Sequence, residues 1–177
     1  MPVTERGDLT VRLFFLLVIM GVAVFLQVTL INFFPIYGVK PDLILMLVVF
    51  NSFLRGRRWG ALSGFLGGIL EDMAIGSYIG MNALSLMAVG YLVGLTESKL
   101  YKDSSIIIVF LVLISSFAAQ VGNYILLSFM GVYVPPGVAL FRIIIPTAAY
   151  TAALVPLFYR WFYRSNQSGF LRGKDFS

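Results

Sequence analysis

The chain has 177 residues, of which 59% are hydrophobic and 12% are charged. Soluble domains carry roughly 25% charged residues, so this composition argues against a soluble protein and for a membrane protein. The sequence contains no Cys and no His, which excludes disulfides, thiolate metal sites, a cysteine nucleophile and the commonest general base. We therefore predict no catalytic residue, no metal site, no cofactor and no nucleic-acid partner, and we use the net charge of +5 to orient the chain in a membrane.

The first predicted element is an apolar run from Leu13 to Ile31, which follows a short charged leader. Signal-peptide cores have roughly 7–15 apolar residues and are followed by small residues. This run is longer, and the next residues, Asn32, Phe33 and Phe34, are bulky. We predict an uncleaved first membrane span.

A second apolar stretch, 43–75, is interrupted near its middle by a basic cluster. The cluster comprises Arg55, Arg57 and Arg58. Each Arg at the bilayer centre costs roughly 2.5–3.5 kcal/mol, which excludes one continuous helix. We predict two spans, Pro41–Leu54 and Trp59–Ile75, joined by a basic loop. Both are shorter than the ~20 residues that cross a bilayer, so their outer ends should lie inside protein or beside a water-filled cavity.

Three more spans are predicted in the second half of the chain, at Met81–Leu95, Ile106–Phe129 and Phe141–Phe162. Pro146 and Pro156 fall inside the last of these and should kink it. The predicted fold class is therefore an all-α integral membrane protein with six transmembrane helices.

The distribution of basic residues predicts the topology of these spans. Of the 13 Lys and Arg residues, all but Lys40 and Arg142 would lie on the side that holds both termini. By the positive-inside rule, both termini are then cytoplasmic. We expect residues 1–163 to form one six-span domain and residues 164–177 to form a polar, disordered cytoplasmic tail.

Glycines recur at four-residue spacing through the third and fourth predicted spans and the turn between them. They are Gly60, Gly64, Gly68, Gly76, Gly80, Gly90 and Gly94. Residues four apart lie on one helix face, and glycines there let two helix backbones approach closely. Such a face packs either against another span of the same chain, which we favour, or against a partner's helix.

Polar residues near the outer ends of the spans predict an outward-facing polar pocket. They are Asp42, Glu71, Asp72, Asn82 and Arg142. Glu71 and Asp72 are adjacent and so about 100° apart on a helix, which argues against a matched pair of catalytic carboxylates. Structural alternatives remain open, because Asp42 suits the start of a helix and one carboxylate could pair with Arg142.

Other polar positions have simpler interpretations. The basic cluster could bind a cytoplasmic partner or anionic lipid, although topology alone requires such a loop. Several amides lie within predicted spans, where hydrogen bonding between helices is the expected use. These amides are Gln27, Asn51, Gln120 and Asn123.

Several short motifs follow one another in a recognisable order. They are Lys40-Pro41-Asp42-Leu43, the run GRRWGALSGF from Gly56 to Phe65, Gly68-Ile69-Leu70-Glu71-Asp72, Asn82-Ala83-Leu84 and Gly90-Tyr91-Leu92-Val93-Gly94. In order and spacing they resemble the MreD family of bacterial rod-shape-determining membrane proteins. The resemblance is strongest over residues 40–95, and length and span number extend it to the whole chain.

The resemblance implies a non-enzymatic part of the cell-elongation machinery in the bacterial cytoplasmic (inner) membrane, in contact with membrane lipid. MreD-like proteins bind MreC directly and help couple MreB filaments to peptidoglycan synthesis, in a complex with RodA and a transpeptidase. A groove at the outer ends of the short spans, with the glycine faces, would receive MreC. The basic cluster would contact MreB or another filament-associated protein.

The family's fold also resembles the substrate-binding subunits of energy-coupling-factor vitamin transporters, so such a subunit is the alternative function. Those subunits commonly carry alanines four apart on their first helix. The corresponding region here reads Gly21-Val22-Ala23-Val24-Phe25 and lacks the pair, which favours the MreD resemblance. A small independent transporter or channel is a further alternative.

Overall fold

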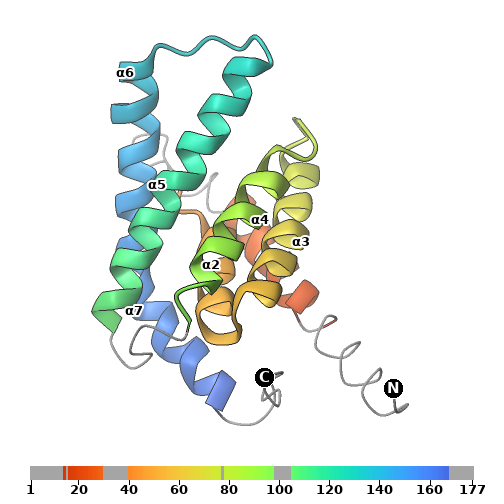
Figure 1. Cartoon of the computed structure of the whole chain (residues 1–177), viewed down its shortest axis with the longest axis vertical. Coiled ribbons are helices and arrows are strands. Elements are labelled where there is room, and N and C mark those ends of the chain that lie inside the picture. The colour runs from red at the N-terminus through yellow and green to blue at the C-terminus, as the bar shows by residue number, and fades with distance from the viewer. Residues whose placement is uncertain (1–13, 15, 30–39, 77, 98–104, 168–177) are drawn as a thin grey trace.

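The computed structural model describes residues 14, 16–29, 40–76, 78–97 and 105–167, and every regular element among them is helical. The elements are an N-terminal helix, Leu16–Thr29, then α2 (Leu43–Arg55), α3 (Arg57–Ile75), α4 (Met81–Gly94), α5 (Ser105–Phe129), α6 (Pro136–Val138), the π-helical segment η1 (Ala139–Ile144) and α7 (Ile145–Gln167). Because α6, η1 and α7 are continuous, six helical rods result, and the predicted all-α class is confirmed for the described residues. In Figure 1, α2, α3 and α4 stand side by side, while α5 and the α6–α7 rod form a second group that extends beyond them.

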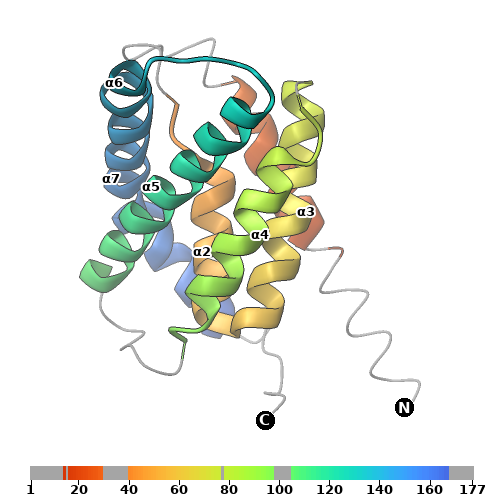
Figure 2. The same ribbon diagram turned by 45° about the horizontal axis from the view of Figure 1, so that its top comes forward.

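The central helix is α2, which contacts α3, α4, α5 and α7 (Figure 2). All of its residues from Leu43 to Phe53 are buried except Leu47. A helix that is apolar on nearly every side is stabilised by burial among other helices. This burial explains how a helix of only 13 residues can form the centre of the bundle. Its Phe50 ring meets the Tyr159 ring of α7 edge to face, with centroids 5.2 Å apart.

The break between α2 and α3 is shorter than the predicted basic loop. Arg55 ends α2, while Arg57 and Arg58 lie in the first turn of α3, so Gly56 alone separates the helices. Gly56 has a φ of 83°, which glycine adopts without the steric cost that a Cβ imposes. One residue therefore makes the turn, and the three arginines do not form a loop.

The last helix starts earlier and ends later than predicted. It begins at Pro136 instead of Phe141, and it passes through η1 before Pro146. In η1 the N–H of Ile145 donates to the carbonyl of Leu140, five residues back. Pro146 has no N–H to donate, and this wider turn accommodates the missing hydrogen bond.

At its other end, α7 continues to Gln167 and so includes the first four residues of the predicted disordered tail. The reason is local, because no Gly or Pro occurs after Pro156 until Gly169, and the intervening residues can all extend a helix. Residues 168–177 lie outside the described residues.

Two helical stretches, Ile106–Phe129 and Pro136–Tyr159, are long and apolar enough to cross a membrane. The apolar helices Leu16–Thr29, α2 and α4 are shorter, and the latter two have 13 and 14 residues. Large apolar side chains are exposed over the outer surface, including Phe25 at 71% and Phe129 at 84%. This surface is typical of a protein surrounded by lipid.

Candidate functional site

The glycines of α3 lie directly against the backbone of α4. A Cβ added at Gly60 would overlap the carbonyl oxygen of Gly90, and one added at Gly64 would overlap the carbonyl oxygen of Leu86. The same contact, here called the α3–α4 seam, includes Gly68 against Ala83 and Gly94 against Arg57. Helices approach this closely only where no Cβ intervenes. These five glycines are therefore occupied by contacts within the chain, and the seam is closed to a partner's helix.

Gly76 and Gly80 serve a different purpose from the other glycines. They have φ values of 69° and 103°, and a Cβ added to either would meet nothing within 4 Å. Gly76 ends α3 and Gly80 precedes α4, so both belong to the turn between the helices. Their value lies in the left-handed backbone that the turn requires and not in helix packing.

Asp72 holds the start of α4 from its position on α3. Its fully buried carboxylate accepts hydrogen bonds from the N–H groups of Gly80 at 2.7 Å, Asn82 at 3.2 Å and Ala83 at 3.3 Å. The residue at the usual capping position, Gly80, has no side chain that could do this. Asp72 thus satisfies the unpaired N–H groups at the beginning of α4, which is a structural role.

A chain of polar side chains continues from this cap toward α5. Asn123 of α5 donates from Nδ2 to Oδ1 of Asn82 at 2.6 Å, and its Oδ1 accepts from the hydroxyl of Ser85, also at 2.6 Å. These are hydrogen bonds between helices, as expected for amides within apolar segments. Asn82 is thereby committed to the α4–α5 contact.

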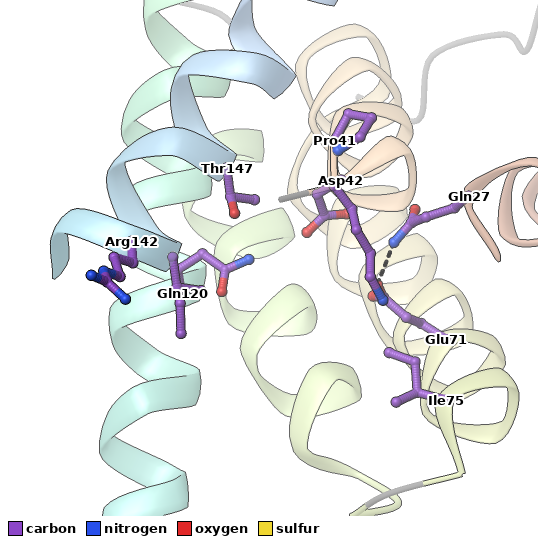
Figure 3. A pocket seen from close by; sticks show the side chains of 10 residues that line it. Gln27, Pro41, Asp42, Glu71, Ile75, Gln120, Arg142 and Thr147 are labelled. Atoms are coloured by element: carbon purple, nitrogen blue, oxygen red, sulfur yellow. Dashed lines mark hydrogen bonds between the residues drawn. The ribbon is translucent and has the colours of Figure 1, made fainter. Parts of the chain in front are cut away.

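A cavity of about 200 Å³ lies between the N-terminal helix, α2, α3, α5 and the η1–α7 rod. Its lining is mixed, with two acidic, two basic and several neutral polar and apolar side chains. The lining residues are Gln27, Lys40, Pro41, Asp42, Glu71, Ile75, Gln120, Arg142, Ile143 and Thr147. Figure 3 shows the Gln120 amide pointing toward the side occupied by Asp42 and Glu71, with Arg142 beyond Gln120.

Gln27 joins three elements at the buried wall of the cavity. Its Nε2 donates to Oε1 of Glu71 at 2.8 Å (Figure 3), and its Oε1 accepts from the N–H of Leu43 at 3.1 Å. The amide thus links the N-terminal helix to α3 and to the first turn of α2. Because both of its polar ends are used, the orientation of the Gln27 amide is defined.

Asp42 caps α2 at the same wall. Its Oδ1 accepts from the N–H of Leu45 at 2.8 Å, and its own N–H donates to the Thr151 hydroxyl of α7 at 2.9 Å. The position therefore starts a helix, as one of the sequence interpretations holds, and it also lines the cavity. The two roles are compatible because the cap uses one carboxylate oxygen.

The cavity brings together three of the five residues of the predicted polar pocket. Asp42, Glu71 and Arg142 line it, whereas Asp72 and Asn82 face the start of α4 and the α4–α5 contact. The adjacent carboxylates Glu71 and Asp72 diverge because neighbouring residues on a helix point about 100° apart.

The sequence interpretation did not place four of the lining polar residues in a pocket. Gln27 and Gln120 are recognisable as amides within apolar helices, but nothing local says which helix each one faces. Lys40 and Thr147 carry no comparable signal.

Gly67, outside the predicted glycine set, also packs closely, since an added Cβ would lie 2.9 Å from Ile44 of α2.

The basic cluster lies at the opposite end of α3 from Glu71. The guanidinium of Arg55 stands over the Trp59 ring, 5.8 Å from its centroid, which is a cation–π distance. Arg57 and Arg58 are exposed. The end of α4 is close by, because Gly94 contacts the Arg57 backbone.

The side chains at these positions take part in hydrogen bonds and helix packing. Within the described ranges, no group of three or more His, Cys, Asp or Glu side chains is placed to hold a metal ion. The cavity instead offers hydrogen-bonding groups and charges of both signs.

Comparison with known proteins adds one finding to this geometry. A family model described as rod shape-determining protein MreD matches residues 8–167, nearly the whole chain. No curated protein and no solved structure shows a significant match.

Proposed function

The chain belongs to the MreD family of rod shape-determining proteins, and we propose that it acts as a non-enzymatic membrane component of the bacterial cell-elongation machinery. In this role it binds MreC directly and helps couple MreB filaments to peptidoglycan synthesis by RodA and its partner transpeptidase. The observation that carries the proposal is the family match over residues 8–167. The absence of Cys and His from the sequence agrees with a role other than catalysis.

We further propose that the protein lies in the cytoplasmic (inner) membrane with six spans and both termini in the cytoplasm. The distribution of Lys and Arg supports this topology. The short helices α2 and α4 are compatible with it, because α2 is enclosed by other helices and need not match the bilayer thickness by itself.

The contact with MreC must use a surface other than the α3–α4 seam. The space beside Gly60, Gly64 and Gly68 is occupied by α4 of the same chain. These glycine faces therefore cannot form part of a docking groove for MreC. We expect MreC to contact the outer apolar surface of the bundle, where many large side chains are exposed.

The test is to recover the complex from its native membrane. A C-terminal tag, mild cross-linking in intact cells, gentle extraction and mass spectrometry should yield MreC, with or without RodA and the transpeptidase. Cross-linking before extraction guards against loss of a weak complex in detergent. Recovery of coupling ATPases would favour the vitamin-transporter alternative, and recovery of the chain alone would contradict the proposed complex.

The exposed pair Arg57 and Arg58 is the proposed cytoplasmic contact with MreB or a filament-associated protein. The double variant Arg57→Gln, Arg58→Gln should reduce MreB recovery while MreC recovery stays unchanged. Arg55 is kept in this variant because it packs over Trp59. Topology must be checked first, since basic residues also orient the spans. Unchanged MreB recovery in a correctly oriented variant would exclude the contact.

A vitamin-binding role receives no support from the cavity. Its volume of about 200 Å³ is below the roughly 300–1,000 Å³ of typical small-molecule sites.

A further inference from the structure

The charges around the cavity are arranged by sign. At the buried wall stand Asp42 and Glu71, each 8% exposed. At the rim stand Lys40 and Arg142, both exposed. The cavity therefore has its acidic groups inside and its basic groups at the entrance, an arrangement complementary to a zwitterion whose cationic end enters first.

Each of the two carboxylates has an oxygen to spare. Oδ1 of Asp42 accepts from Leu45 and Oε1 of Glu71 accepts from Gln27. Within the part of the chain that the structure describes, no hydrogen bond uses the second oxygen of either group. The charge of Lys40 acts on Glu71, and an ammonium group inside the cavity could in addition donate to the second oxygen of both carboxylates, which would reduce the cost of burying them.

The surroundings of Arg142 indicate that the entrance faces lipid. Arg142 lies in η1 between Phe141, which is 69% exposed, and Ile143, which is 46% exposed. Arginines on such an apolar surface place their guanidinium at the level of lipid headgroups, where phosphate is the available anion. Ile75, at the end of α3, adds a further exposed apolar side chain to the rim.

We propose that this cavity binds the headgroup of a phosphatidylethanolamine molecule. The ammonium group donates to Asp42 and Glu71, and the phosphate is held by Arg142 and Lys40. The acyl chains continue over the exposed apolar surface beside Ile143. Phosphatidylcholine is disfavoured because its quaternary ammonium cannot donate hydrogen bonds, and phosphatidylglycerol is disfavoured because its headgroup lacks a cation.

The site goes beyond the proposed function, because it requires neither MreC nor MreB. It is tested on the purified full chain in detergent, with added phosphatidylethanolamine, phosphatidylcholine or phosphatidylglycerol of identical acyl chains. Thermal unfolding is followed as a function of lipid concentration. Phosphatidylethanolamine should stabilise the protein at about tenfold lower concentration than the other two lipids, as expected for a charge-assisted hydrogen bond.

Two variants address the two ends of the headgroup. Glu71→Gln keeps an oxygen for Gln27 but loses the charge, so it should abolish the preference for phosphatidylethanolamine over phosphatidylglycerol. Arg142→Gln, at an exposed position that leaves the fold intact, should weaken phosphatidylethanolamine binding about tenfold. Glu97→Gln, which removes a carboxylate outside the cavity, should leave the preference among the three lipids unchanged.

Three results would overturn the proposal. Equal stabilisation by the three lipids would mean that the protein does not distinguish their headgroups. An unchanged lipid preference in both cavity variants would place the binding elsewhere. Displacement of the lipid by free phosphoethanolamine at equal concentration would assign the cavity to a soluble zwitterion. None of these results bears on the recovery of MreC, so this proposal and the proposed function fail independently.

Discussion

Glu71 and Asp72 are adjacent in α3 but serve different parts of the molecule. Glu71 turns toward the cavity and accepts from Gln27, whereas Asp72 turns toward α4 and accepts from three backbone N–H groups. A carboxylate suits the second position because the N-terminal end of a helix carries a partial positive charge. The two neighbours therefore differ in what their loss should cost.

Replacement of Asp72 is predicted to destabilise the fold. Asp72→Ala leaves the N–H groups at the start of α4 without an acceptor, which should cost roughly 1–3 kcal/mol of unfolding free energy. Asp72→Asn, which keeps one acceptor oxygen, should lose less. Thermal unfolding of the purified protein in detergent, followed by circular dichroism, measures both. A melting temperature of Asp72→Ala equal to that of the unaltered chain would refute the capping role.

Among the elements, α3 and α4 form the closest pair. Gly60, Gly64 and Gly68 remove the side chains that would hold the two backbones apart. Between helices in lipid no hydrophobic driving force operates, and dispersion contacts at short range replace it. Such a seam tolerates little added volume, because neither backbone can move without losing those contacts.

Adding one methyl group to the seam is predicted to separate the helices. Gly64→Ala should lower stability by about 1–3 kcal/mol, seen as a lower melting temperature. The matched control is Gly122→Ala in α5, where the added Cβ would lie 3.5 Å from Ser85, an ordinary contact. Because alanine favours helix over glycine, that control should be neutral or slightly stabilising. Equal effects of the two substitutions would argue against a tight seam.

The whole molecule combines a central short helix with longer outer rods. Because α2 is enclosed by other helices, its length need not match the thickness of the bilayer. The rods that contain Ile106–Phe129 and Pro136–Tyr159 have the length and apolarity of membrane spans. The cavity lies where α2 begins and α3 ends while these rods continue.

The predicted topology can be measured by cysteine labelling, which the chain favours because it has no native Cys. Tyr133 lies between α5 and α6 and is 83% exposed, and Leu95 lies just after α4 and is 42% exposed. The substitutions Tyr133→Cys and Leu95→Cys therefore place one thiol on each predicted side of the membrane. A membrane-impermeant maleimide should label the first site from outside the inner membrane and the second only after permeabilisation. The reverse pattern would overturn the assignment of the termini to the cytoplasm.

By itself, the sequence determined the features that depend on neighbours along the chain. The helices, the helix start at Asp42 and the four-residue glycine spacing all follow from local backbone geometry and side-chain periodicity. The boundaries were less accurate at Gly56 and before Pro146, where one special residue changes the backbone path. The apolar composition indicated the membrane class because composition reflects the solvent that surrounds the whole fold.

Only the tertiary structure decided which faces meet. It directed the glycines of α3 to α4, separated Glu71 from Asp72, and joined Gln27, Lys40, Gln120 and Thr147 to Asp42, Glu71 and Arg142 around one cavity. These residues come from five elements that are distant in the sequence. Their meeting depends on how the helices are rotated and packed against each other, and periodicity within one helix carries no information about the orientation of another.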